Sequence, residues 1–345
     1  IAVQKGDSVP VSKFTCDGTF PTATSQYEKR GVAVKVPRWI SENCIQCNQC
    51  SFVCPHAVIR PYLLTEEEAN GAPEGTPFLQ AVGKDFKEYK YKIQISPLDC
   101  VGCGSCADVC PGKKGEKALE MDMLEDLEAV EGKQYEYLTS LPLKELDGNP
   151  YTVKNSQFKQ PLFEFSGACA GCGETPYVKL LTQLFGDRML IGNATGCSSI
   201  YGGTCPPSPY TVNKEGNGPT WANSLFEDNA EYALGMRLAI SQTQTKLASL
   251  IEEAKSFSAV NANLKAAFEG WLAEGNLAEP SVKWAKEIKK YLADAVANAD
   301  DAEQSVLAEI QEKQDYLVKK SGRAFAPARR PHGPNCGSLD YLLAS

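Results

Sequence analysis

The chain has 345 residues, a formal net charge of −8 and 43% hydrophobic residues. The acidic balance argues against a nucleic-acid partner, and no apolar stretch approaches the roughly 18 residues that a membrane helix requires. Fourteen cysteines without an export signal lead us to expect metal binding in a reducing compartment, the cytoplasm. The first residues carry neither an initiator Met nor a signal pattern and read like the middle of a longer polypeptide.

The first part of the chain predicts an irregular lead-in followed by a small α+β domain. Residues 1–40 are rich in Pro, Gly and Thr, and Cys16 is expected there as a lone, buried structural thiol. Residues 41–125 carry most of the cysteines. Two segments at 32–36 and 91–95 predict short strands, each followed by a cysteine loop and a short helix. This repetition indicates an internal duplication.

Two runs of one cysteine pattern dominate this domain. Each reads C-x2-C-x2-C-x3-C and is followed by proline, which is the bacterial ferredoxin arrangement for two [4Fe-4S] clusters. Three thiolates of one run can face three corners of one cluster, while the fourth points to the other cluster. We therefore expect one cluster on Cys44, Cys47, Cys50 and Cys110, and the second on Cys100, Cys103, Cys106 and Cys54.

Zinc is the main alternative for these cysteines. It usually takes two C-x2-C pairs separated by a longer loop, and two unbroken runs that end in Cys-Pro fit that pattern poorly. A disulfide framework belongs to much shorter secreted chains. Iron–sulfur clusters are the favoured interpretation, and they imply transfer of single electrons at low potential.

The remaining chain predicts a connector, an α/β segment and a helical arm. Residues 126–165 are punctuated by prolines and are expected to connect the domains. Residues 166–228 predict the start of an α/β domain. Residues 229–320 show apolar positions at helical spacing and charges between them. Packing is the expected role of this arm, and binding of a partner along an amphipathic face is the alternative.

The α/β segment begins with a helix and a buried strand. Thr175 is expected to cap the helix, with Pro176 at its first position. Residues 188–194 then read as a short strand that leads into Cys197. This order would place Cys197 just beyond the carboxyl end of a strand, where open α/β sheets bind ligands.

A third set of cysteines lies in this segment. Cys169 and Cys172 form a C-x2-C pair, and Cys197 follows at a distance. By spacing alone, the set fits zinc, a redox pair or an incomplete cluster. A cluster needs a fourth ligand, which could be Cys205, Cys336 or a residue outside this chain.

The motifs around these cysteines resemble those of pyruvate:ferredoxin oxidoreductases. The thiamine-diphosphate domain of that family is similar to residues 167–175 (GACAGCGET) and 194–203 (ATGCSSIYGG). Its ferredoxin-like domain is similar to residues 44–56 (CIQCNQCSFVCPH). The resemblance extends to about residue 321. It implies an internal segment of such an enzyme, with a two-cluster ferredoxin-like domain followed by a partial α/β thiamine-diphosphate domain that carries a helical insertion.

The resemblance also implies roles for individual residues. Cys169, Cys172 and Cys197 would be three ligands of a third [4Fe-4S] cluster whose fourth ligand lies beyond residue 345. Glu174 and Cys197 would contact thiamine diphosphate, while no catalytic acid–base residue is assigned in this chain.

The implied reaction is the oxidative decarboxylation of pyruvate with coenzyme A to acetyl-coenzyme A and CO2. Electrons would pass to ferredoxin or flavodoxin, and the enzyme would be a homodimer. An oxidoreductase for another 2-oxoacid is one alternative. A ferredoxin-type electron-transfer module without catalysis is the other.

The end of the chain departs from the family. A Gly-Asp-Gly motif that holds Mg2+ and diphosphate is expected near residues 326–330, and it does not occur in this sequence. Residues 321–345 are instead a divergent segment rich in Pro and Arg. Residues 322–338 have two alternative explanations, a reading-frame error in the recorded sequence and a genuine surface loop. As written, the chain is not expected to bind Mg2+ and thiamine diphosphate by itself, and Cys336 is assigned no ligand role.

Overall fold

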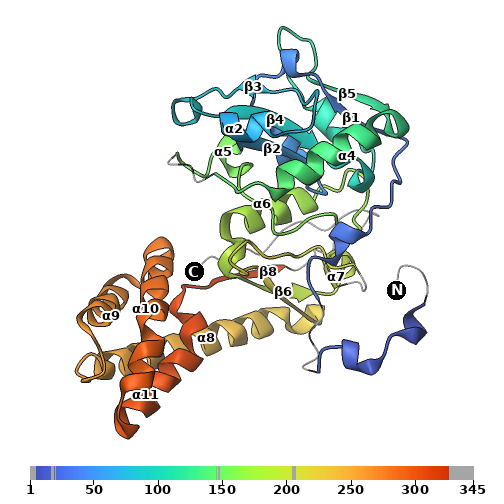
Figure 1. Ribbon diagram of the computed structural model, residues 1–345. Helices are drawn as coiled ribbons and strands as arrows, with labels where there is room; N and C mark the ends of the chain where they lie inside the picture. Colours follow the sequence, from blue (N-terminus) through green and yellow to red (C-terminus); the bar gives the residue numbers. More distant parts are fainter. Residues whose placement is uncertain are drawn as a thin grey trace. The chain divides into compact units, whose positions relative to one another are not determined.

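The computed structural model describes residues 5–16, 19, 21–144, 146, 148–203 and 207–325 (Figure 1). These residues form two compact units. The first unit holds residues 5–187 and 195–219, and the second holds residues 188–194 and 220–325. The boundary divides the predicted α/β segment, because its strand belongs to the second unit and the helix at Cys197 belongs to the first.

The first unit contains two small antiparallel sheets in its described residues. One sheet pairs β1 (Lys35–Trp39) with β5 (Leu119–Met123). In the other, β4 (Lys90–Ile95) lies between β2 (Ile59–Leu64) and β3 (Leu79–Gln80). Valine, isoleucine and aromatic residues, which favour strands, are frequent in these segments. The strand predicted at 91–95 is confirmed, whereas the one predicted at 32–36 begins only at Lys35.

The strands of the two cysteine halves interleave. The first half runs from β1 through its cysteine loop to β2, and the second runs from β4 through its loop to β5. β1 pairs with β5 and β2 pairs with β4, so each sheet contains strands of both halves. Each cysteine run also contains a short helix, α1 (Gln49–Val53) or α3 (Ser105–Asp108). The predicted duplication is therefore present, and it brings the two cysteine loops into one core.

Further helices surround this core. Their bounds are α2 (Glu66–Asn70), α4 (Leu124–Ser140), α5 (Val153–Ser156), α6 (Thr175–Phe185) and α7 (Cys197–Gly203). The long helix α4 occupies much of the predicted connector at 126–165, because no proline interrupts the chain before Pro142.

The predicted cap of α6 is wrong. Glu174 occupies the cap position, and its side chain makes no capping hydrogen bond. Its backbone is already close to helical, with φ −93° and ψ −47°, so Thr175 lies inside the first turn and is buried. A threonine side chain caps a helix only from the flanking, extended position.

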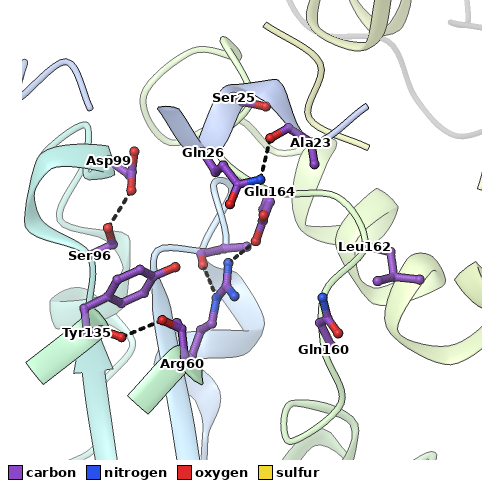
Figure 2. A network of polar contacts seen from close by, with 12 residues as sticks. Ala23, Ser25, Gln26, Arg60, Ser96, Asp99, Tyr135, Gln160, Leu162 and Glu164 are labelled. Carbon is purple, nitrogen blue, oxygen red and sulfur yellow. Dashed lines mark hydrogen bonds and ion pairs between the residues drawn. The ribbon is translucent and has the colours of Figure 1, made fainter. Parts of the chain in front are cut away.

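Polar contacts hold residues 23–30 against the cysteine domain. Lys29 forms an ion pair with Asp99, which directly precedes Cys100. Arg60 faces Glu164 and pairs with it, and the Tyr135 ring lies beside this pair (Figure 2). The Lys29 ammonium is 5.2 Å from the centre of the same ring. The end of the lead-in is therefore part of the first unit.

Cys16 lies in the earlier part of the lead-in and is exposed. The expected buried structural thiol is therefore wrong. The neighbouring described residues 5–15 are themselves nearly all exposed, so this segment offers no core in which a thiol could be buried.

The second unit combines a parallel sheet with a helical arm. β6 (Met189–Ala194) lies between β7 (Thr220–Ser224) and β8 (Ser321–Phe325), and both neighbours run parallel to it. β6 confirms the strand predicted at 188–194. Four helices lie in the range predicted as a helical arm, 229–320: α8 (Asn229–Ala254), α9 (Ala262–Glu274), α10 (Ala278–Asn298) and α11 (Asp301–Glu312).

The arm has its own hydrophobic core. Leu247, Phe268, Ile288 and Leu307 come from its four successive helices, and each is 0% exposed. Apolar residues at helical spacing therefore pack against each other, as the sequence predicts. None of the helices in the described ranges combines the length and hydropathy needed to cross a bilayer.

Replacing Phe268 by alanine tests this core. We expect Phe268→Ala to lower the free energy of unfolding by about 3–5 kcal/mol, because it removes a buried ring and leaves a cavity. Leu238→Ala on α8 is the control, since Leu238 is 52% exposed and its loss should change stability by less than about 0.5 kcal/mol. Chemical denaturation followed by circular dichroism measures both, and equal losses would contradict a core around Phe268.

A capping box fixes the start of α2. The Thr65 hydroxyl accepts a hydrogen bond from the Glu68 N–H at 3.2 Å, and the Glu68 carboxylate accepts one from the Thr65 N–H at 2.8 Å. Lys144 donates to the same carboxylate at 2.5 Å. Partial burial acts to raise the pKa of Glu68, but Lys144 and Thr65 outweigh it and lower that pKa below its ordinary value of 4.5.

The lowered pKa gives this box a pH dependence. The unfolded chain binds the Glu68 proton more tightly than the folded chain does. The ionised Glu68 carboxylate therefore stabilises the folded state above pH 4.5, and this contribution is lost as the pH falls below that value. We expect Glu68→Gln to cost about 1 kcal/mol at pH 7, with the difference from wild type vanishing in acid. Glu67→Gln, on the exposed side of α2, is the control. If Glu68→Gln still lowers the free energy of unfolding at pH 3, the charge of the Glu68 carboxylate is not the cause.

Candidate metal centres

The two cysteine loops share one backbone conformation. The second residue after the first cysteine has positive φ in both loops, at Gln46 (60°) and Gly102 (69°). The fourth residue does so as well, at Asn48 (60°) and Gly104 (77°). A side chain at Gly102 would also approach the Lys35 carbonyl to 3.1 Å. The left-handed positions turn each loop tightly, so that its first three cysteines face the same side.

Side-chain hydrogen bonds hold the non-glycine residues in this unusual conformation. The Gln46 amide donates to the Gln80 carbonyl and accepts from the Val82 N–H, both at 2.8 Å. The Asn48 side chain accepts a hydrogen bond from the Tyr91 hydroxyl at 2.6 Å. Such contacts offset the cost of a left-handed backbone at residues other than glycine.

Backbone N–H groups point at the sulfurs of both loops. Gln46 N–H lies 3.4 Å from the Cys44 sulfur, and Gly102 N–H lies 3.4 Å from the Cys100 sulfur. Ala118 N–H lies at the same distance from the Cys110 sulfur. Hydrogen bonds of this kind favour the thiolate and raise the potential of a cluster bound to it.

Two small cavities lie among these cysteines. Each has a volume of about 20 Å³. The cysteines that line the first are Cys44, Cys47, Cys50 and Cys110. The cysteines that line the second are Cys54, Cys100, Cys103 and Cys106. Each cavity thus receives three cysteines of one run and the last cysteine of the other, which is the grouping that the spacing predicts.

The chemistry of the thiols fits a cationic iron–sulfur core. Burial raises the pKa of Cys44 and Cys50, and it raises the pKa of Cys100 to about 12. Neighbouring cysteines act in the same direction, so four thiolates cannot coexist in one cavity without a positive partner. A bound metal centre supplies that charge and deprotonates the thiols that coordinate it.

A single metal ion has different geometric demands. Zinc draws four ligands to one centre at about 2.3 Å from each sulfur. The described residues contain no group of three or more His, Cys, Asp or Glu side chains arranged to hold one ion. The ligand assignment itself stays a prediction, which metal and sulfide analysis tests.

The third set of cysteines lies partly beside the second cavity. Cys169 and Cys172 are on the loop before α6, where the Cys172 N–H donates to the Cys169 carbonyl at 3.1 Å. Gly171 between them has φ 70°, and a Cβ placed on it would be 3.8 Å from the Cys103 side chain. This loop therefore packs against the second cysteine run.

Cys197 is exposed and begins α7. Tyr201, one turn later on this helix, lies close to the Cys172 thiol and to the Glu174 carboxyl. Glu174 is buried, and burial raises its pKa while the Tyr201 hydroxyl acts in the opposite direction. The structure thus brings α7 to the loop of Cys169 and Cys172. The alternative fourth ligands Cys205 and Cys336 lie outside the described residues.

His56 connects the second cavity to the third set. It lines the second cavity, and its two ring nitrogens face carbonyl oxygens. Nδ1 is 2.9 Å from the Ser166 oxygen, and Nε2 is 3.3 Å from the Cys169 oxygen. The ring therefore fixes the Cys169 loop next to the run that ends at Cys54.

Sequence reasoning missed several residues that shape the centres. Gln46 and Asn48 stand in the first run where the second run has glycines, and this difference was a usable signal for side chains that stabilise a left-handed backbone. Lys179 lies on the buried face of α6, next to Val178 and Thr182. Thr175, Thr182 and Gln183 share this face, so the sequence carried no signal that Lys179 is buried.

Comparisons with known proteins agree with this geometry. Residues 43–114 match the family model described as a 4Fe-4S dicluster domain. Residues 1–33 match a model described as a domain of unknown function. The cysteine region is therefore a 4Fe-4S dicluster, ferredoxin-like domain of mixed helix and sheet, close to the predicted bounds of 41–125.

Relatives align with almost the whole chain. A pyruvate:ferredoxin oxidoreductase of Moorella thermoacetica is 54% identical over 99% of this chain. A pyruvate-flavodoxin oxidoreductase of Enterobacter agglomerans is 49% identical over 99% of it. The chain matches one segment of pyruvate:ferredoxin and pyruvate-flavodoxin oxidoreductases. It spans 29% of the length of each of these two relatives, and the expected resemblance to an internal segment is confirmed.

A pyruvate dehydrogenase of Euglena gracilis, named for NADP+, also contains a similar segment. It is 42% identical over 99% of this chain, which spans 18% of that protein. The oxidoreductase-type segment thus occurs in proteins named for different electron acceptors.

Single cysteine variants test how the two cavities are filled. If each cavity holds one cluster, Cys110→Ala should damage the same cluster as Cys44→Ala, and Cys54→Ala should damage the same one as Cys100→Ala. Electron paramagnetic resonance of the reduced variants would show one surviving cluster signal within each pair. A Cys110→Ala spectrum that matches that of Cys100→Ala would contradict the crosswise arrangement.

Proposed function

We propose that this chain is the electron-transfer and cofactor portion of a 2-oxoacid:ferredoxin oxidoreductase. The enzyme would convert pyruvate and coenzyme A to acetyl-coenzyme A and CO2, and the two electrons released would leave singly to ferredoxin or flavodoxin. The observation that carries the proposal is the pair of cavities, each lined by four cysteines, three from one run and the last from the other. The names and high identity of the relatives support pyruvate as the substrate.

The arrangement of cysteines supports a route through three [4Fe-4S] clusters. The third set would receive the electron first, because Glu174 and Cys197 are the residues that the resemblance assigns to the thiamine site. The Cys169 loop packs against Cys103 and approaches His56, next to the second cavity. Helix α1 then joins that cavity to the first. Cys50 lies in α1 and lines the first cavity, and Cys54 directly follows α1 and lines the second.

Thiamine diphosphate with Mg2+ supplies the carbanion-stabilising chemistry when it is bound. In this chain, Glu174 and Cys197 would contact it. Burial raises the pKa of the Glu174 carboxyl, and the Tyr201 hydroxyl acts in the opposite direction. Residues 326–330, where the family carries its Gly-Asp-Gly motif, lie outside the described residues, and the fourth ligand of the third cluster is expected from elsewhere in the enzyme.

The proposed partners follow from the same reading. They are the remaining domains of the enzyme, a second copy in a homodimer, pyruvate, coenzyme A and a small electron carrier, in the cytoplasm. An oxidoreductase for another 2-oxoacid is the second candidate. A comparison of 2-oxoacids as substrates would decide between the two.

Cluster content and turnover test the proposal together. The anaerobically purified chain should contain roughly eight irons and eight acid-labile sulfides in its two complete clusters, and dithionite should produce a paramagnetic signal. Bound zinc without sulfide would refute the clusters.

A Cys172→Ser variant of the intact oxidoreductase tests the route. Pyruvate and coenzyme A should no longer reduce ferredoxin efficiently, because the entry cluster is damaged, while dithionite should still reduce the two ferredoxin-type clusters. Unchanged turnover in this variant would show that the third set lies off the electron path.

A further inference from the structure

Lys179 is a buried lysine that contacts the segment between Cys50 and Cys54. Burial lowers the pKa of its ammonium to about 8, while the Cys54 and Cys50 thiols act in the opposite direction. The Lys179 side chain is on α6 and is 1% exposed. The ammonium donates hydrogen bonds to the carbonyls of Ser51 and Phe52, the latter at 3.3 Å. Both carbonyls lie in α1, and the Ser51 carbonyl also accepts a hydrogen bond from the Cys54 N–H at 3.2 Å. The lysine therefore holds the segment that joins Cys50 to Cys54.

The ammonium acts on cysteines of both cavities. It lies within electrostatic range of the Cys50 thiol, which lines the first cavity, and of the Cys54 thiol, which lines the second. A charge in this position faces both centres at once. Because the surroundings are buried, water and salt screen these interactions less than they would at the surface.

Lys179 has no carboxylate partner among the residues that the structure describes. None of the ion pairs within the described ranges includes it. Lys92, which is also buried, differs in this respect, because the Glu131 carboxylate acts on it. Arg60 near Lys179 is likewise paired, with Glu164. A buried ammonium without an acid is unfavourable unless other negative charge compensates it.

The compensating charge can come from the clusters themselves. A four-iron cluster with four thiolate ligands carries a net negative charge, and reduction adds one further electron. A nearby buried cation favours the more negative, reduced form. The charge on Lys179 and the charge on the clusters thus stabilise each other, and the effect is larger after reduction.

We propose that Lys179 is a positioning residue that serves as the shared counter-charge of the two ferredoxin-type clusters, clamping α1 between them and raising both reduction potentials. This inference rests on the proposed function, since it requires clusters in both cavities. It adds a residue from outside the cysteine domain to the control of electron transfer. Helix α6 starts next to the third cysteine set, so the same helix links that set to the other two centres.

The test is a redox titration of the intact chain, followed by electron paramagnetic resonance, for wild type, Lys179→Met and Lys179→Gln. Methionine removes the charge at similar volume, and glutamine keeps a donor for the α1 carbonyls without the charge. At a fixed solution potential near the midpoint, we expect both variants to show a reduced-to-oxidised ratio at least roughly tenfold lower, which corresponds to 59 mV for one electron.

Lys154→Met is the matched control. Lys154 is a cation that acts on Cys44 and Cys47, but its side chain is only partly buried and its ammonium donates to the Val82 carbonyl at 2.6 Å. Solvent screening should keep the change in the ratio for this variant below roughly threefold. Shifts for Lys179→Met and Lys179→Gln no larger than that of the control would overturn the proposal.

Loss of clusters in the variants is also decisive. If Lys179→Met and Lys179→Gln lose iron and sulfide while Lys179→Arg retains them, a positive charge is required for assembly, which supports the proposal. If all three variants lose their clusters, the position requires the shape of lysine and the counter-charge role is refuted. Absence of iron and sulfide from the wild-type chain would instead refute the proposed function, before any variant is compared.

Discussion

The structure depends on the mutual approach of eight cysteine thiols in two small cavities. Burial raises the pKa of Cys44, Cys50 and Cys100, and their neighbours within each cavity act in the same direction. Two such cavities in one small domain are unfavourable for a metal-free thiolate form and favourable for a cationic core that binds four sulfurs. The 4Fe-4S dicluster assignment of residues 43–114 agrees with this constraint. The fold can therefore be understood as an arrangement that delivers cysteines of both runs to both cavities.

Several elements serve this arrangement. The interleaved pairs β1–β5 and β2–β4 bring the ends of the two runs across each other, so that Cys54 and Cys110 each reach the other run's cavity. Residues with a left-handed backbone conformation turn both cysteine loops. The side chains of Gln46 and Asn48 hold the first loop in that conformation. The loop before α6 packs against the second run, and His56, which follows the first run, contacts the Cys169 carbonyl. The first unit thus places all three cysteine sets in one continuous body.

The sequence predicted the features that local pattern determines and missed those that tertiary contacts determine. Cysteine spacing predicted which cysteines line each cavity, and apolar spacing predicted a strand and helices where β6 and α8 to α11 lie. Cys16 was wrongly expected to be buried, because a lone cysteine carries no information on whether a core surrounds it. Thr175 was wrongly taken as a cap, since the preceding backbone is already close to helical. Lys179 was missed because its role depends on α1, far away in the sequence.

Anaerobic crystallography with anomalous diffraction at the iron edge tests the central claim most directly. The account predicts two compact iron peaks in the first unit, one within each cysteine cavity, with three cysteines of one run and the last cysteine of the other bonded to each. Single-atom peaks with a zinc edge, or clusters bound by the four cysteines of one run each, would contradict it.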